Sequence, residues 1–221
     1  MLPLRDLNPT RRPPVVNIAL IALNVVAFGY ELSLGPQFGR FLSTFAFAPV
    51  RLFGPEATAG NALLTALTSM FLHAGWAHIG GNMLFLWIFG DNVEDTLGHL
   101  RYVVFYFASG LAATLAHALS SPTSALPAIG ASGAISGVLG AYVFLYPRAR
   151  IVTAFMLFVF IRIVEVPAFV YLPLWFLLQL ASGVATVNTA QASAGGTAWF
   201  AHIGGFVAGP LLLLLLRPRR R

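Results

Sequence analysis

The feature that most constrains this chain is its series of long apolar runs separated by short polar segments. Only 9% of the 221 residues are charged and 58% are hydrophobic. Soluble domains usually carry roughly 25% charged residues, so a fold with an ordinary water-facing surface is ruled out. The length allows roughly six or seven helical spans of about 20 residues each. The sequence therefore predicts an all-α polytopic membrane protein in a lipid bilayer.

The charged residues indicate how the chain is oriented. All 13 basic residues are arginines, against 7 acidic residues, which gives a net charge of +6. A basic balance can indicate nucleic-acid binding, but these arginines flank the apolar runs, and basic flanks stay in the cytoplasm. We therefore expect both termini in the cytoplasm, an even number of spans and no nucleic-acid partner. The terminal arginines are Arg5, Arg11, Arg12, Arg217, Arg219, Arg220 and Arg221.

Polar and helix-breaking residues divide the chain into three parts and six spans. We expect a cytoplasmic tail at 1–14, a membrane domain at 15–216 and a basic cytoplasmic tail at 217–221. Between the spans we expect a structured interfacial loop at 32–61, a short polar turn at 91–101 and a flexible loop at 186–197. The predicted spans are 15–34, 76–93, 102–119, 129–146, 167–185 and 198–216.

The segment 151–166 is apolar but contains Arg162 and Glu165. Both side chains are costly in the middle of a bilayer. We therefore interpret this segment as an interfacial or re-entrant connection. The alternative, in which it also spans, would place the two arginine-rich termini on opposite sides of the membrane.

Three clusters inside the predicted spans carry groups that can do chemistry. His78 and Asn82 share one helix face, Ser132 opens a glycine-rich span, and His202 lies in the last span. Stripes of small residues let helices approach closely in lipid. One stripe lies on the span of Ser132 and another on the span of His202, and if the two meet, Ser132 and His202 come together. A serine hydroxyl beside a neutral imidazole is a minimal activated nucleophile. The helix-packing stripes are Gly133, Gly137 and Ala141, and Ala201, Gly205 and Gly209.

Each of these residues also has an ordinary explanation. A lone serine in such a helix usually bonds its own i−4 carbonyl, and glycine stripes often serve packing only. His78 on its own would fit an interhelical hydrogen bond. His73 and Trp76 fit interfacial anchors, and His117 fits a structural or interfacial role.

Taken together, the clusters resemble the rhomboid family of intramembrane serine proteases over about residues 15–216. The matching strings are His73-x4-His78-x3-Asn82, Gly130-x-Ser132-Gly133 and Ala201-His202-x2-Gly205. The resemblance implies a six-transmembrane-helix bundle that cleaves single-span transmembrane proteins, without a metal or cofactor. It also implies that Ser132 is the nucleophile and that His202 is the general base and then the acid. The implied oxyanion hole comprises His78, Asn82 and the backbone N–H of Ser132.

Two positions depart from the family pattern, and the carboxylates bear on the mechanism. Ser136 stands where many members carry an aromatic that packs on the histidine, so another side chain must brace His202. The first loop lacks the common Trp-Arg pair, which Arg40 or Arg51 would replace in part. The resemblance implies a Ser-His dyad rather than a triad, and no third partner is evident in the sequence, since six carboxylates lie outside the predicted spans or near their ends and only Glu165 is ambiguous. The six are Asp6, Glu31, Glu56, Asp91, Glu94 and Asp95.

Two other functions remain open on the sequence. One is a catalytically dead rhomboid-like protein that binds membrane proteins, and the other is a haem-binding or transport protein that uses intramembrane histidines. Because no appended domain or targeting segment is evident, we expect a prokaryotic inner membrane. The loop 186–197 is expected to cap a hydrated site that opens on the non-cytoplasmic side.

Overall fold

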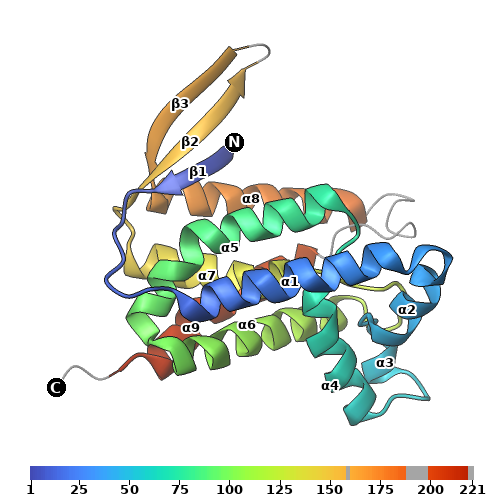
Figure 1. The fold of residues 1–221 in the computed structure, drawn as a ribbon. Helices are drawn as coiled ribbons and strands as arrows, with labels where there is room; N and C mark the ends of the chain where they lie inside the picture. The colour runs from blue at the N-terminus through green and yellow to red at the C-terminus, as the bar shows by residue number, and fades with distance from the viewer. Residues whose placement is uncertain (158–159, 188–198, 219–221) are drawn as a thin grey trace.

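The computed structural model describes residues 1–157, 160–187 and 199–218. Within them, six helices of 14 residues or more lie side by side (Figure 1). Each lies within or largely overlaps one of the six predicted spans. They are α1 (Val15–Ser33), α5 (Trp76–Leu97), α6 (His99–Ser120), α7 (Ser132–Leu145), α8 (Ala168–Val187) and α9 (Trp199–Leu216).

The apolar character of these helices confirms the prediction of a helical membrane protein. The helices α1, α6 and α9 are long and apolar enough to cross a bilayer. A fourth crossing is possible if α5 is combined with the preceding pair α4 (Ala59–Thr68) and η2 (Ser69–Phe71), which meets it at 87°. The helix α7 and the described apolar part of α8 are shorter than a full span. That the chain crosses the membrane six times therefore remains a prediction.

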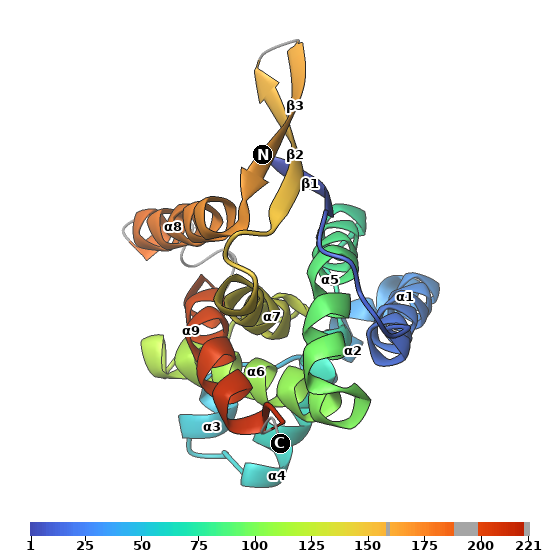
Figure 2. The same ribbon diagram turned by 90° about the vertical axis from the view of Figure 1, so that its left-hand side faces the viewer.

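The helix α7 forms the centre of the bundle and contacts α5, α6, α8 and α9. Figure 2 looks along the helices and shows α7 between them. Its glycines and small side chains are almost all buried, so the neighbouring helices pack close to its backbone. The core around it contains large aromatic side chains, which include Phe89, Tyr102, Phe105, Tyr106 and Tyr142.

The expected structured loop at 32–61 contains several short helices. They are η1 (Gly35–Gln37), α2 (Phe38–Phe45) and α3 (Val50–Phe53), and they are followed by α4. The guanidinium of Arg51 donates to the carbonyl oxygens of Ser43 and Thr44 and to Asn61 Oδ1. Arg51 therefore ties α2 to α4 and stabilises this loop from within.

The segment 151–166, for which we expected an interfacial or re-entrant connection, is a β-hairpin and not a span, so the all-α prediction is incomplete. Strand β2 (Arg150–Leu157) pairs antiparallel with β3 (Phe160–Pro167). The expected N-terminal tail adds β1 (Leu2–Asp6) to the other edge of β2. Isoleucine, valine and phenylalanine are concentrated in β2 and β3, and such residues favour strands.

The predicted polar turn at 91–101 is also wrong in extent. Helix α5 continues to Leu97, and Gly98 alone separates it from α6, with a φ of 78° that favours glycine. Glu94 therefore lies inside α5 and is buried. Its carboxylate accepts from the backbone N–H groups of Val16 (3.0 Å) and Asn17 (2.7 Å) at the start of α1. Glu94 thus satisfies two donors that a helix N-terminus leaves free.

Candidate functional site

The loop before α7 positions Ser132 as the first residue of that helix. Gly130 adopts a φ of 121°, in the region that favours glycine, and its N–H donates to the carbonyl oxygen of Ser69 at 2.9 Å. A Cβ at Gly130 would lie only 2.6 Å from His78 Nε2. Glycine is therefore required here both for the turn and for the approach of α5.

The structure brings Ser132 and His202 together from α7 and α9. Ser132 Oγ lies 2.7 Å from His202 Nε2, which is a normal hydrogen-bond distance. His202 is 7% exposed. In the neutral imidazole, Nε2 can accept the hydroxyl proton of Ser132, which is the arrangement of an activated nucleophile.

The small residues of α7 and α9 set this short distance. A Cβ added to Gly205 would overlap the carbonyl oxygen of Gly133, and one added to Gly209 would overlap that of Gly137. A Cβ on Gly137 would meet Ser109 of α6 at 2.5 Å. The backbones of α7 and α9 are therefore in direct contact along this face.

Two tryptophans, and not residue 136, supply the aromatic contacts to His202. The ring of Trp175 on α8 lies 6.2 Å from that of His202, and the ring of Trp199 lies 5.9 Å from it, edge to face. Ser136 instead donates from its hydroxyl to the carbonyl oxygen of Ser132 at 2.7 Å. Its small side chain is fully buried beside Gly205, where a larger one would displace α9.

His78 and Asn82 both lie against Gly130, two residues before Ser132. A Cβ at Gly130 would be 3.6 Å from Asn82 Nδ2 and still closer to His78 Nε2. The Nδ1 atom of His78 accepts from the backbone N–H of Ala74 at 3.4 Å. In the neutral ring the proton is then on Nε2, so His78 presents an N–H donor toward the loop that carries Ser132.

His73 is not an interfacial anchor, because its side chain is buried and bonded. Asn82 Nδ2 donates to His73 Nε2 at 2.9 Å, and His73 Nδ1 lies 3.3 Å from the carbonyl oxygen of Phe71. The backbone N–H of His73 in turn donates to the Glu31 carboxylate, at 3.1 and 3.3 Å. Glu31 is buried in the last turn of α1. His73 and Glu31 therefore orient Asn82, a role that the sequence analysis did not assign to either of them.

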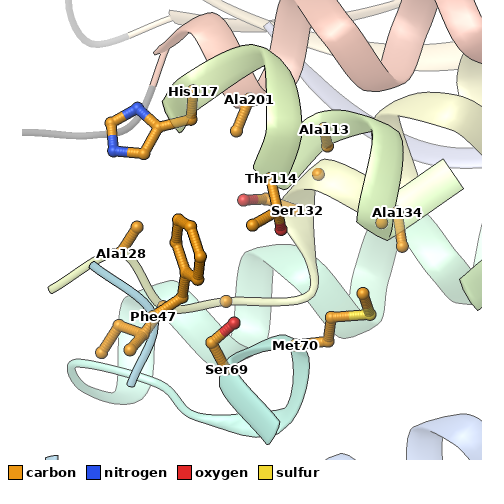
Figure 3. Close-up of a pocket in the computed structure, with 14 residues that line it drawn as sticks. Phe47, Ser69, Met70, Ala113, Thr114, His117, Ala128, Ser132, Ala134 and Ala201 are labelled. Carbon is orange, nitrogen blue, oxygen red and sulfur yellow. The ribbon is translucent and has the colours of Figure 1, made fainter. Parts of the chain in front are cut away.

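A cavity of about 40 Å³ opens beside Ser132 (Figure 3). By the roughly 15 Å³ that one water needs, it has room for two or three waters. His117 lies on its wall, so this histidine belongs to the site rather than to a span end alone. Its Nδ1 atom is buried without a hydrogen-bond partner in the described part of the chain. The other lining residues include Phe47, Ser69, Met70, Ala113, Thr114, Ala128 and Ala201.

The remaining site predictions lie elsewhere. Glu165, the ambiguous carboxylate, is in β3 and pairs with Arg150 at 3.6 Å. Most of the expected cap, 186–197, falls outside the described residues. Among the residues described, no group of three or more histidine or acidic side chains is placed to hold a metal ion.

The match to known proteins covers the part of the chain that holds this site. Residues 60–219, more than half of the sequence, match the model of the rhomboid domain. The chain belongs to the rhomboid family. With its apolar helices, this membership establishes an integral membrane protein.

Rhomboid relatives come from distant sources. The chain is 31% identical over 198 residues to the mitochondrial Rhomboid protein 1 of Saccharomyces cerevisiae, which covers 87% of this chain and 51% of the relative. It is 28% identical over 224 residues to RHOMBOID-like protein 1 of Arabidopsis thaliana, covering 93% and 52%. It is also 32% identical over 143 residues to the rhomboid protease GluP of Bacillus subtilis, covering 65% and 24%. The chain thus spans about half the length, or less, of these curated relatives.

Proposed function

We propose that this rhomboid protein is an intramembrane serine endopeptidase in which Ser132 and His202 form a catalytic dyad. The observation that carries the proposal is the 2.7 Å contact between Ser132 Oγ and His202 Nε2. It is supported by the name of the Bacillus relative, a rhomboid protease. Glu31 and Glu94 accept from backbone N–H groups and Glu165 forms an ion pair with Arg150, which favours a dyad over a triad.

The proposed reaction begins when Ser132 Oγ attacks the scissile carbonyl and His202 Nε2 takes the hydroxyl proton. The carbonyl oxygen then carries negative charge. Donors for it are the backbone N–H of Ser132, the second N–H of the Asn82 amide and the Nε2–H of His78. Since Ser132 opens α7, the free N–H groups and the positive end of the helix dipole favour the anion there.

Collapse of this intermediate releases the amine, which receives the proton from His202. Water then attacks the acyl group on Ser132, with His202 again as the base, and releases the acid. The small cavity beside Ser132 is where we place this water. The groups that begin the reaction are neutral serine, histidine and asparagine side chains, and among them only His202 gains a charge, while it holds the transferred proton.

The proposed substrates are single-span transmembrane proteins. A peptide bond in a helix is shielded by its own hydrogen bonds, so the substrate must unwind near small or helix-breaking residues to reach Ser132. We also propose that both termini are cytoplasmic. The matched relatives are mitochondrial, plant and bacterial, and they give no support to a prokaryotic inner membrane in particular.

Cleavage of a single-span substrate in liposomes tests this function. We expect activity in the native protein, none in Ser132→Ala or His202→Ala, and full activity in the control Ser33→Ala. Ser33 is exposed at the end of α1, and its hydroxyl bonds only locally. A fluorophosphonate probe should label the native protein at Ser132 and fail to label Ser132→Ala. Undiminished cleavage by Ser132→Ala would refute the assignment, and a folded but inactive, unlabelled native protein would favour the non-catalytic alternative.

A further inference from the structure

The hairpin of β2 and β3 has a surface that is unusual for a strand pair in water. In β3, Phe160, Ile161 and Ile163 are 72%, 66% and 63% exposed, and Val164 is also exposed. Successive side chains point to opposite faces of a strand, so Ile161 and Ile163 lie on one face and Phe160 and Val164 on the other. A sheet that is solvated on one face normally alternates apolar and polar residues. Here both faces carry exposed apolar side chains.

The direction of the hairpin bears on what covers these side chains. In Figure 1 the hairpin leaves the bundle at the end where α1 begins and α9 ends, and its strands rise from there at a steep angle to the helices. Figure 2 shows it extending outward from the bundle when viewed along the helices. In a membrane crossed by α1, α6 and α9, this direction is closer to the bilayer plane than to the membrane normal. The hairpin therefore lies beside the bundle, at the level of one membrane surface.

Charge and backbone hydrogen bonding limit its depth. Arg5, Arg148, Arg150 and Arg162 are exposed on the hairpin or next to it. Arg150 pairs with Glu165, and the other arginines have no such carboxylate partner within the described residues. The outer edge of β3 is unpaired there, because the sheet order is β1-β2-β3. Unpaired strand edges do not occur against lipid in the hydrocarbon core, but they are compatible with the hydrated headgroup layer.

We propose that the hairpin is a membrane-surface element that inserts its apolar side chains into the headgroup–acyl boundary and binds anionic headgroups through its arginines. The lipid layer surrounds the hairpin, so it covers Phe160 and Val164 as well as Ile161 and Ile163. A second copy laid on one face would leave the other in water. Arginine matches phosphate oxygens in geometry and charge, which favours an anionic leaflet. This surface is separate from the proposed catalytic residues and does not depend on them.

Because the chain has no cysteine, single cysteines allow a direct test in the full-length protein. Ile163→Cys carries an environment-sensitive fluorophore in phosphatidylcholine vesicles with or without phosphatidylglycerol. Val26→Cys, on the exposed side of α1, is the reference for lipid. Pro218→Cys, exposed after α9, is the reference for water. Nitroxide lipids labelled at shallow or deep positions and aqueous iodide are the quenchers.

We expect the probe at Ile163 to lose most of the iodide quenching seen at Pro218 and to be quenched more by shallow than by deep nitroxides. The probe at Val26 should show the reverse depth preference. Iodide quenching equal to that at Pro218 would overturn the proposal, because the hairpin would then lie in water. Protection from both kinds of quencher would also overturn it, in favour of a protein partner such as a second copy.

The charge part of the proposal has its own measurement. Phosphatidylglycerol should increase nitroxide quenching at Ile163, and high salt should reduce that increase because it screens exposed charges. Adding Arg162→Glu to the Ile163→Cys chain should diminish the response. An equal response in both lipids would refute anionic headgroup binding.

Discussion

The contact between α7 and α9 makes a quantitative prediction for Gly205→Ala. A Cβ at this position would overlap the carbonyl oxygen of Gly133 and lie 3.1 Å from its carbonyl carbon and 3.2 Å from Ser136 Cβ. Ordinary contacts of a Cβ begin at 3.4 Å, and two of these three neighbours are backbone atoms that cannot rotate away. The helices must therefore separate, by on the order of 1 Å, since close-packed interiors offer no spare volume.

That separation acts directly on the proposed dyad. Gly205 is one turn beyond His202, and Gly133 follows Ser132. A shift of about 1 Å would lengthen the 2.7 Å contact between Ser132 and His202 beyond hydrogen-bond range. Misplacements of this size cost about 10²-fold in rate, and overpacking costs roughly 1–3 kcal/mol of stability. We expect Gly205→Ala to show both losses.

Initial rates of substrate cleavage in liposomes, together with thermal unfolding in detergent, measure these effects. The matched control is Gly29→Ala in α1, where a Cβ meets nothing within 4 Å. This variant should keep its cleavage rate and its stability. If Gly205→Ala cleaves as fast as Gly29→Ala, the reasoning from helix contact to dyad geometry is refuted.

Two further predictions concern buried and half-buried carboxylates. Glu31→Ala leaves the backbone N–H of His73 unpaired, so it should cost about 1–3 kcal/mol in unfolding free energy and lower kcat by misplacing Asn82. Glu31→Gln keeps an acceptor and should restore both the stability and kcat. Equal behaviour of the two variants would contradict the role of Glu31 in orienting Asn82. Burial raises the pKa of the Asp6 carboxyl, which accepts from the Tyr142 hydroxyl at 2.6 Å, above its usual 3.8. The folded state thus favours the protonated acid and loses stability as the pH rises through the raised pKa. Asp6→Asn should therefore unfold at a higher temperature than the native chain at neutral pH, with no difference between the two below pH 3.8. Thermal unfolding at several pH values measures this.

Local and periodic signals in the sequence predict the helices well. The apolar runs correspond to α1, α5, α6, α7, α8 and α9 with shifts of a few residues at their ends, because length and hydropathy decide where a helix can lie in a bilayer. The small-residue stripes likewise indicate which helices can approach closely. In the structure Ser132 and His202 face each other across those stripes.

Features that depend on distant contacts are the ones that sequence reasoning missed. Arg162 and Glu165 argue against a span at 151–166, but they cannot show that β2 pairs with β1, which is more than 140 residues away in the chain. The bond between Glu31 and His73 joins residues 42 positions apart. Hydropathy carries no information on such pairings. The only sequence signals for the Glu31–His73 bond were a carboxylate near the end of the first predicted span and a second histidine five residues before His78.

The proposed dyad depends on helix packing, because the buried carboxylates Glu31 and Glu94 bond to backbone groups elsewhere. In a membrane protein a buried carboxylate must be compensated, and Glu94 and Glu31 are compensated by backbone N–H groups at the start of α1 and at His73. They hold the ends of helices together and position donors. The orientation of His202 rests on ring contacts with Trp175 and Trp199 and on the close approach of α9 to α7. Added volume at this interface should therefore reduce activity more than the removal of a surface charge does.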